Sequence, residues 1–371
     1  MKLIFDIETD GLKPTVVWVI CAIKDDAMIT LEMPSKADVE SLLEGVTEVI
    51  GHNIIGYDIP ALEKLLGVSF DNVKITDTLV LSRLYNPSLE GGHSLGKWGE
   101  RLKFPKGDYN DWTALTPEMV GYCQQDVWVT ERLYELLMGK LEEFGSESID
   151  LEHNVQSEIV KQISNGWLLD QRRAFDLLAT LQEKKNDLEE MVLRVFKPLP
   201  TFVKQVVPKY KKDGSLSSVG LKFLGEMWVH VGGEFSRVDF PEFNLGSRKQ
   251  IGRYLQYFGW KPTEFTDNGQ PIVDERTLND VSDIPEAALI AEYLLVQKRI
   301  AQVQSWIDAV ESDGRVHGQV NSIGAVTGRM THSSPNMAQV PAVYSEYGKE
   351  CRSCWTVPEG YKLVGVDTPG S

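Results

Sequence analysis

Two acidic side chains stand two positions apart in the first apolar segment of the chain. They are Asp6 and Glu8. Alternate residues of a β-strand point to the same face, so both carboxylates share one face while Leu3, Phe5 and Ile7 occupy the other. Acids beside an apolar core are costly unless a cation pairs with them, and a divalent ion such as Mg²⁺ prefers carboxylate oxygen. The pair therefore predicts a metal site, with a solvent-facing edge strand as the alternative.

A third acid, Asp58, follows an apolar strand expected at 46–50 and a turn. A helix is predicted to begin near Asp58, so this carboxylate could do no more than cap the helix. The start of a helix can also direct a carboxylate into a cleft. The residues around Asp58 leave both interpretations open.

A fourth acid, Asp126, comes four residues after Tyr122 in a segment with helical spacing. Positions i and i+4 share a helix face, so the phenol and the carboxylate point the same way. Alone, this is an ordinary surface pair. With the earlier acids, in this order over about 120 residues, it predicts two-metal hydrolysis of phosphodiesters. One ion would lower the pKa of the attacking water, the other would stabilise the leaving 3′ oxygen, and Tyr122 would orient the water.

The elements that must position these residues are predicted to form an α/β layer up to about residue 146. Strands are expected at 3–7, 16–23 and 28–33. A helix is expected at 117–144, with Pro117 in its first turn. The polar stretch 145–150 is the expected boundary of this layer.

Beyond that boundary the pattern is mainly helical. Helices are expected over 151–196, with a break near Asn165, and again at 246–258 and 285–311. Residues 197–242 are rich in Pro, Gly and Lys, which indicates an extended insertion or loop. Short strands are expected after residue 314.

Length and charge limit the possible functions. The chain has 371 residues, enough for two or three domains, and a formal net charge of −16. A negative charge argues mildly against nucleic-acid binding, but carboxylates that hold metal ions need not repel a phosphate. Residues 197–212 also carry five lysines and no acid. No apolar stretch has the length of a membrane span, so we expect a soluble intracellular protein that makes no membrane contact.

Cys351 and Cys354 form a CxxC pair. A zinc site needs a second pair of ligands, and a redox motif needs a βαβ context that the pattern does not show. We therefore interpret them as two reduced thiols.

The acidic set resembles the DEDDy exonuclease superfamily, and Tyr122 places it in the tyrosine branch. The resemblance implies a ribonuclease H-like domain over 1–147, with a mixed central sheet flanked by helices. It implies that four carboxylates bind two divalent ions, Mg²⁺ or alternatively Mn²⁺; these ligands are Asp6, Glu8, Asp58 and Asp126. Asn53 is similar to the substrate-side asparagine of the superfamily, and His52 is expected to be structural.

A run in the C-terminal half, Thr327-Gly-Arg329 followed by Asn336 and Gln339, resembles the first polymerase motif of family A DNA polymerases. Upstream, Phe243-Asn244 with Ser247 and Gln250 also resembles that family. The resemblance implies a thumb-like helical region over 148–312 and the start of a palm over 313–371. It places Thr327, Arg329, Asn336 and Gln339 near DNA, and makes Asp367 the first palm metal ligand.

The phage T-seven type of replicative polymerase is similar over nearly the whole chain. The similar runs are 77–84, 93–102, 106–109 and 317–329. The resemblance implies DNA replication, with proofreading of single-stranded 3′ ends and binding of a primer–template. Residues 197–242 stand where that type carries an insertion for a thioredoxin-like processivity factor, but they are shorter and suit a DNA backbone contact at least as well.

The chain departs from the family after Asp367, where Pro369 breaks the strand pattern. The fingers and the second palm carboxylate are missing, so we expect no polymerisation by this chain alone. It would be one part of a split polymerase with a second chain, an interrupted gene product or a truncated form, in the host cytoplasm if phage-encoded. The alternatives are a stand-alone DEDDy ribonuclease and a non-catalytic DNA-binding subunit.

Overall fold

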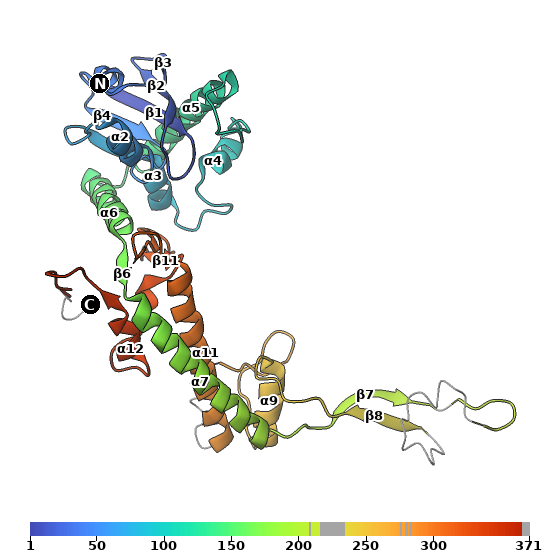
Figure 1. Cartoon of the computed structure of the whole chain (residues 1–371). Helices are drawn as coiled ribbons and strands as arrows, with labels where there is room; N and C mark the ends of the chain where they lie inside the picture. The colour runs from blue at the N-terminus through green and yellow to red at the C-terminus, as the bar shows by residue number, and fades with distance from the viewer. Residues whose placement is uncertain (208, 216–233, 275–276, 279–280, 282–283, 366–371) are drawn as a thin grey trace. The chain divides into compact units, whose positions relative to one another are not determined.

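The computed structural model describes residues 1–207, 209–215, 234–274, 277–278, 281 and 284–365. They form two compact units (Figure 1). The first unit comprises Met1–Asp170 and Ala309–Ser371, and the second comprises Gln171–Asp308.

A mixed five-stranded sheet organises the first unit, in the order β3-β2-β1-β4-β5. Its strands are β1 (Lys2–Thr9), β2 (Val17–Lys24), β3 (Ala27–Glu32), β4 (Glu48–Gly51) and β5 (Lys74–Asp77). β1 pairs antiparallel with β2 and parallel with β4. The strand that carries Asp6 and Glu8 is therefore central, which excludes the edge-strand alternative.

Helices cover both faces of this sheet (Figure 1). They are α1 (Lys36–Leu43), α2 (Asp58–Leu66), α3 (Thr78–Tyr85), α4 (Leu95–Arg101) and α5 (Pro117–Lys140). Leu3, Phe5 and Ile7 of β1 enter the core on the side of α1 and α2, whereas Ile4 enters the core that contains α5. Each such side chain contributes about 1.5–3 kcal/mol when buried. The alternation predicted for β1 is confirmed, and it leaves Asp6 and Glu8 on the face toward α5.

Local sequence signals set the ends of the two helices that carry site residues. Thr116 caps α5 by accepting a hydrogen bond from the amide of Met119, and Pro117 occupies the first turn, where no amide is needed. Gly67 ends α2 with φ 68°, a conformation that glycine adopts without steric cost.

Residues 145–150, where the sequence predicts the boundary of the α/β layer, contain the start of a long helix. Helix α6 (Ser146–Asn165) begins after Gly145 and is followed by β6 (Trp167–Leu169). β6 pairs with β9 (Arg315–Val316) and β12 (Trp355–Thr356), so these elements belong to the first unit.

The C-terminal part of the first unit is attached to α6. Side-chain contacts make the attachment: His317 Nδ1 lies 2.7 Å from the carbonyl oxygen of Ile163, Ser322 Oγ donates to Gln156 Oε1 over 3.1 Å, and Arg315 donates to the carbonyl oxygen of Asn165 over 3.1 Å. The remaining elements are β10 (Gln319–Asn321), β11 (Thr331–Ser333), the 3₁₀ helix η2 (Met337–Gln339) and α12 (Gly348–Ser353). Cys351 and Cys354 are buried at α12, and Cys354 Sγ donates to the carbonyl oxygen of Glu350.

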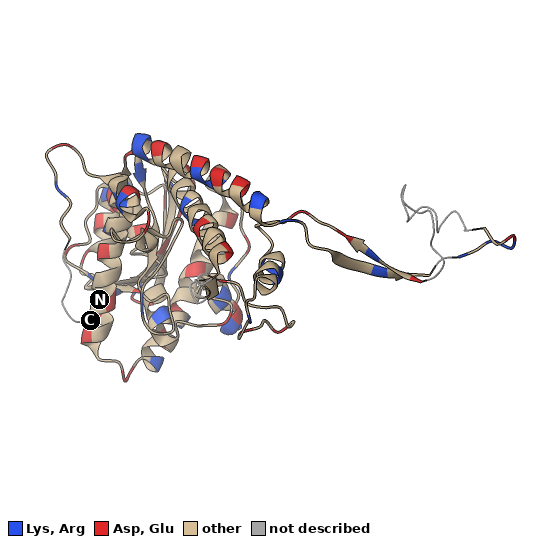
Figure 2. Ribbon diagram, turned by 90° about the horizontal axis from the view of Figure 1, so that it is seen from below, with Lys and Arg blue, Asp and Glu red and all other residues tan. Residues whose placement is uncertain are grey.

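The second unit is built on two long helices that pack together, α7 (Gln171–Val195) and α11 (Pro285–Asp308). The shorter helix α9 (Arg248–Tyr257) completes the core. Residues 197–242 were expected as an insertion or loop, but part of this stretch forms an antiparallel ribbon of β7 (Thr201–Val206) and β8 (Phe235–Asp239). This ribbon contains basic residues, among them Lys204 and Arg237. Figure 2 colours the positions of Lys and Arg blue along it.

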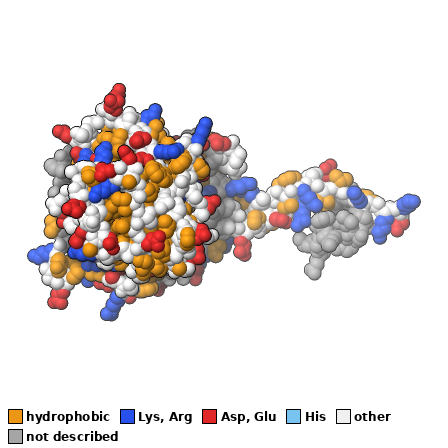
Figure 3. Space-filling view, turned by 90° about the horizontal axis from the view of Figure 1, so that it is seen from above, with side chains coloured by type: hydrophobic (Ala, Val, Ile, Leu, Met, Phe, Trp, Pro, Cys, Tyr) orange, Lys and Arg blue, Asp and Glu red, His pale blue; other side chains and the backbone are white. Residues whose placement is uncertain are grey.

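The surface carries apolar as well as charged side chains. In the face shown in Figure 3, hydrophobic side chains gather in the middle, among acidic and basic ones. None of the described helices is both long and apolar enough to cross a bilayer.

Candidate active site

Four carboxylates from three elements line one cleft of about 240 Å³ in the first unit. Asp6 and Glu8 come from β1, Asp58 from α2, and Asp126 from α5. Tyr122 also lines the cleft, so the structure brings together all five residues of the acidic set. They are separated by up to 120 residues in sequence, and the sheet order places β1 between β2 and β4, beside α5.

Asp58 contacts the central strand directly. Tyr57, not Asp58, occupies the N-cap position of α2, and its side chain makes no capping hydrogen bond. Oδ1 of Asp58 accepts a hydrogen bond of 3.2 Å from the backbone amide of Ile7. The capping alternative therefore does not hold: Asp58 joins α2 to the strand that carries Asp6 and Glu8.

Asp126 is only 2% exposed, and its two oxygens differ. Oδ2 is paired with Lys106, whereas Oδ1 has no hydrogen-bond partner among the described residues. A buried acceptor without a partner is costly, typically by about 1–3 kcal/mol. This oxygen thus fits a ligand that the cleft would take up.

The electrostatics of the cleft favour bound cations. Burial first, and then the charge of Asp126, raise the pKa of Glu8 to about 8. Burial also raises the pKa of Asp58 to about 7, and burial with the surrounding carboxylates raises the pKa of Asp6. Each shift reports that the negative form is unfavourable without a positive partner. Carboxylate oxygens are the donors that Mg²⁺ and Mn²⁺ prefer, so the residues present fit a divalent metal site.

Lys106 is a cleft residue that the sequence did not single out as part of the site. Its ammonium is paired with Asp126 and lies 4.4 Å from the centre of the Tyr122 ring. It stands in an irregular segment twenty residues before Asp126, where no spacing rule connects the two. The only sequence signal for Lys106 is its position in the run 106–109, which resembles the phage T-seven type of polymerase.

Asn53 lines the cleft from a strained turn. Its φ is 64°, a left-handed conformation that Asn tolerates better than most residues. The backbone amide of Asn53 donates a hydrogen bond to Oδ1 of Asp77 over 2.8 Å. The same buried carboxylate accepts hydrogen bonds from the backbone amides of Ile55 and Leu79, so Asp77 holds the turn in place. Asp77 is a second positioning residue that the sequence did not identify.

His52 also lines the cleft, but its ring is hydrogen-bonded to another side chain of the protein. Its Nδ1 lies 2.9 Å from Thr78 Oγ1. Burial, with the nearby charge of Lys106, lowers the pKa of His52 to about 3. A neutral, hydrogen-bonded ring agrees with a structural role.

The residues of the polymerase-like motif lie elsewhere in the first unit. Thr327 and Arg329 are exposed on the turn between β10 and β11, where Gly328 has φ 73°. Asn336 caps η2 by accepting from the amide of Ala338, and Gln339 ends that helix. These four residues thus lie on consecutive segments of the first unit, and none of them lines the carboxylate cleft. Asp367, the predicted palm ligand, lies outside the described residues.

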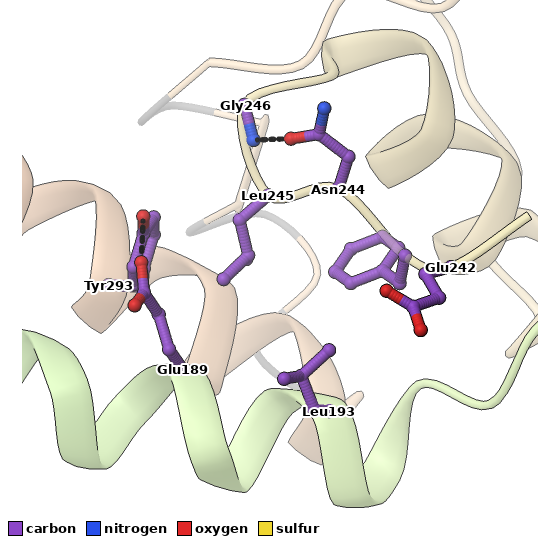
Figure 4. Close-up of a pocket in the computed structure, with 8 residues that line it drawn as sticks. Glu189, Leu193, Glu242, Asn244, Leu245, Gly246 and Tyr293 are labelled. Carbon is purple, nitrogen blue, oxygen red and sulfur yellow. Dashed lines mark hydrogen bonds between the residues drawn. The ribbon is translucent and has the colours of Figure 1, made fainter.

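A second pocket, of about 330 Å³, lies in the second unit between α7, α11 and residues 242–246 (Figure 4). Tyr293 donates to Glu189 across one side of it, over 2.9 Å. The run that resembled a polymerase motif has local packing roles here: Phe243 stacks on Phe196 at 4.6 Å, and Ser247 caps α9.

Comparisons with known proteins relate the chain to DNA polymerases. The fold is similar to that of the polymerase domain of Pol1 from M. smegmatis, solved in complex with DNA primer-template and dNTP, with a TM-score of 0.67 at 16% identity. That match covers 97% of this chain and 55% of the other. The model of DNA polymerase family A matches residues 227–369.

Two phage enzymes are similar over most of the chain. The DNA-directed DNA polymerase of Enterobacteria phage T3 is 32% identical, and that of Escherichia phage T7 is 31% identical, each over 83% of this chain. The chain belongs to DNA polymerase family A, in the group of the T7 and T3 enzymes, which confirms the resemblance found in its motifs. It spans 57% of the length of these two relatives.

Proposed function

We propose that the first unit is a two-metal 3′→5′ exonuclease that removes nucleotides from DNA 3′ ends. The observation that carries the proposal is the meeting of four carboxylates in one cleft, where Asp126 Oδ1 has no hydrogen-bond partner among the described residues. The mixed order of the sheet, with β1 central between an antiparallel and a parallel neighbour, supports a ribonuclease H-like domain.

The proposed roles follow from where each side chain lies. The four carboxylates would hold two Mg²⁺ ions, or Mn²⁺. Such ions, when bound, activate a water molecule and stabilise the leaving 3′ oxygen. The hydroxyl of Tyr122 would orient the attacking water, and Asn53, which also lines the cleft, would contact the substrate. Trp112, whose ring meets Tyr122 edge-on at 5.8 Å, offers an aromatic surface for an unstacked base.

Membership of family A gives this nuclease a context. We propose that it proofreads primer ends for a replicative DNA polymerase, and that Thr327, Arg329, Asn336 and Gln339 contact the primer–template. Asp367 would be a palm metal ligand. The proposed domains are the exonuclease at 1–147, a thumb-like region at 148–312 and a palm segment at 313–371. The exposed position of Arg329 and the basic side chains of the β7–β8 ribbon support contacts with the DNA backbone.

The test is degradation of 3′-labelled single-stranded DNA with Mg²⁺. The wild-type chain should release mononucleotides, and Asp6→Ala combined with Glu8→Ala should abolish release while leaving duplex DNA binding intact. Lys140→Ala, a change at an exposed lysine at the end of α5, is the control. An RNA strand of the same sequence identifies the alternative: faster cleavage of RNA than of DNA would favour a ribonuclease. No release from either strand would overturn the proposal.

A further inference from the structure

One cation stands among the four carboxylates of the cleft. Among the described residues that line it, Lys106 is the one lysine or arginine. Its ammonium pairs with Oδ2 of Asp126 and lies over the ring of Tyr122. A positive charge therefore already occupies part of the site proposed for metal ions.

The backbone holds Lys106 in this position. The amide of Phe104 donates to Gly99 of α4 over 2.9 Å, and the carbonyl oxygen of Pro105 accepts from Gln125 of α5 over 2.9 Å. A Cβ atom on Gly99 would lie 2.9 Å from the amide nitrogen of Lys106, which is closer than atoms pack. The segment thus passes tightly between two helices, and Lys106 enters the cleft from a fixed backbone, unlike a surface lysine.

The ion pair has two consequences. It holds the carboxylate of Asp126 beside Tyr122, four residues earlier on the same helix face. It also occupies Oδ2, one of the two oxygens of Asp126 that a divalent ion could use, because an ammonium and a metal ion cannot both contact Oδ2 closely without strong repulsion. Oδ1 remains without a partner among the described residues, so only half of this carboxylate is open to a metal.

We propose that Lys106 is a positioning residue that acts as a built-in counter-ion: it holds Asp126 when the cleft lacks metal, and it releases Asp126 when a divalent ion binds there. This inference about Lys106 rests on the proposed exonuclease function. Lys106 competes with the ion for Asp126, and thereby sets the concentration of Mg²⁺ or Mn²⁺ at which the site fills. A residue with a purely structural role would act in the opposite direction, because its loss would disorder the ligands and weaken metal binding.

The test is Mn²⁺ binding to the full chain, measured from the loss of the free-ion electron paramagnetic resonance signal and from the thermal unfolding temperature. Lys106→Met removes the charge but keeps an unbranched stem. It should lower the unfolding temperature without metal and bind Mn²⁺ about tenfold more tightly, since a positive charge beside the ions is gone. Lys106→Arg should stay near the wild type. Lys103→Met, the same change at an exposed lysine of the same segment, is the matched control.

The outcomes separate this inference from the proposed function. If the wild type binds Mn²⁺ and Asp6→Ala with Glu8→Ala abolishes binding, the metal site stands. Unchanged or weaker Mn²⁺ binding by Lys106→Met, or an equal gain in Lys103→Met, would then overturn the role of Lys106 alone. A Lys106→Met variant that folds only with Mn²⁺ supports the inference, because the ion then replaces the ammonium. If this variant folds in neither buffer, Lys106→Gln decides by the same measurements.

Discussion

The backbone amide of Ile7 donates a hydrogen bond to Oδ1 of Asp58, and this bond joins strand β1 to the first turn of α2. Its donor lies between Asp6 and Glu8 in sequence. Asp58 thus has two separable properties, a hydrogen-bond acceptor that aligns the two elements and a negative charge that faces the cleft.

Substitutions at Asp58 should separate alignment from charge. Asp58→Asn keeps an oxygen for the Ile7 amide but removes the charge, so we expect normal stability with exonuclease activity reduced by about 100-fold or more. Asp58→Ala also leaves the buried amide unpaired and should lower the free energy of unfolding by about 1–3 kcal/mol. Urea unfolding and 3′-end degradation measure the two effects. Equal stability of both variants would show that the bond to Ile7 contributes nothing.

Stability without metal should depend on pH in a defined direction. Burial raises the pKa of Glu8 from 4.5 to about 8 and that of Asp58 from 3.8 to about 7. Between the unfolded and the folded pKa, the folded chain retains protons that the unfolded chain has released, so stability falls as pH rises. We expect the unfolding temperature to decrease from pH 5 to pH 8 in chelator, and to decrease less in Mg²⁺. Glu8→Gln should flatten the profile in chelator. A rise in stability over this range would contradict the burial of these acids.

Asp77 should matter for the shape of the cleft without entering it. Its carboxylate accepts hydrogen bonds from the amides of Asn53, Ile55 and Leu79. Asp77→Ala should lower the free energy of unfolding by about 3 kcal/mol or more, since three amides lose their acceptor. Asp77→Asn retains one acceptor oxygen and should cost less. The KM for single-stranded DNA should rise with the loss of stability, because Asn53 is held by the same carboxylate. A destabilised Asp77→Ala variant with an unchanged KM would show that Asn53 does not bind substrate.

Arg329 tests the proposed contact with the primer–template. Its side chain is exposed on the β10–β11 turn, apart from the carboxylate cleft. If it neutralises a phosphate, Arg329→Ala should weaken duplex binding and reduce the slope of log affinity against log salt by about one. Degradation of single-stranded DNA should not change. Lys140→Ala is a control for the loss of one positive charge, and equal effects of the two variants would argue against a specific contact.

Periodicity in the sequence predicted the elements well where one face is buried. The two-residue alternation of β1 placed Leu3, Phe5 and Ile7 on one side of the sheet, as the structure has them. Proline and capping residues set the start of α5 correctly at Pro117. At 145–150 the polar residues that predicted a boundary lie in the exposed first turn of α6. The ribbon of β7 and β8 was missed because most of its residues are exposed and its sequence shows no clear alternation.

The sequence by itself determined the types and order of the acids, and the motifs that assign the chain to family A. The acids and the motifs can be recognised from residue types and their spacing along the chain, without knowledge of the fold. Only the tertiary structure decided that Asp58 bonds to β1 and does not cap its helix, that β1 is central, and that Lys106 neutralises Asp126. Such relationships join residues far apart along the chain. They arise because the sheet order and the packing of α5 bring these residues together in the interior, where a buried charge without a partner is strongly destabilising.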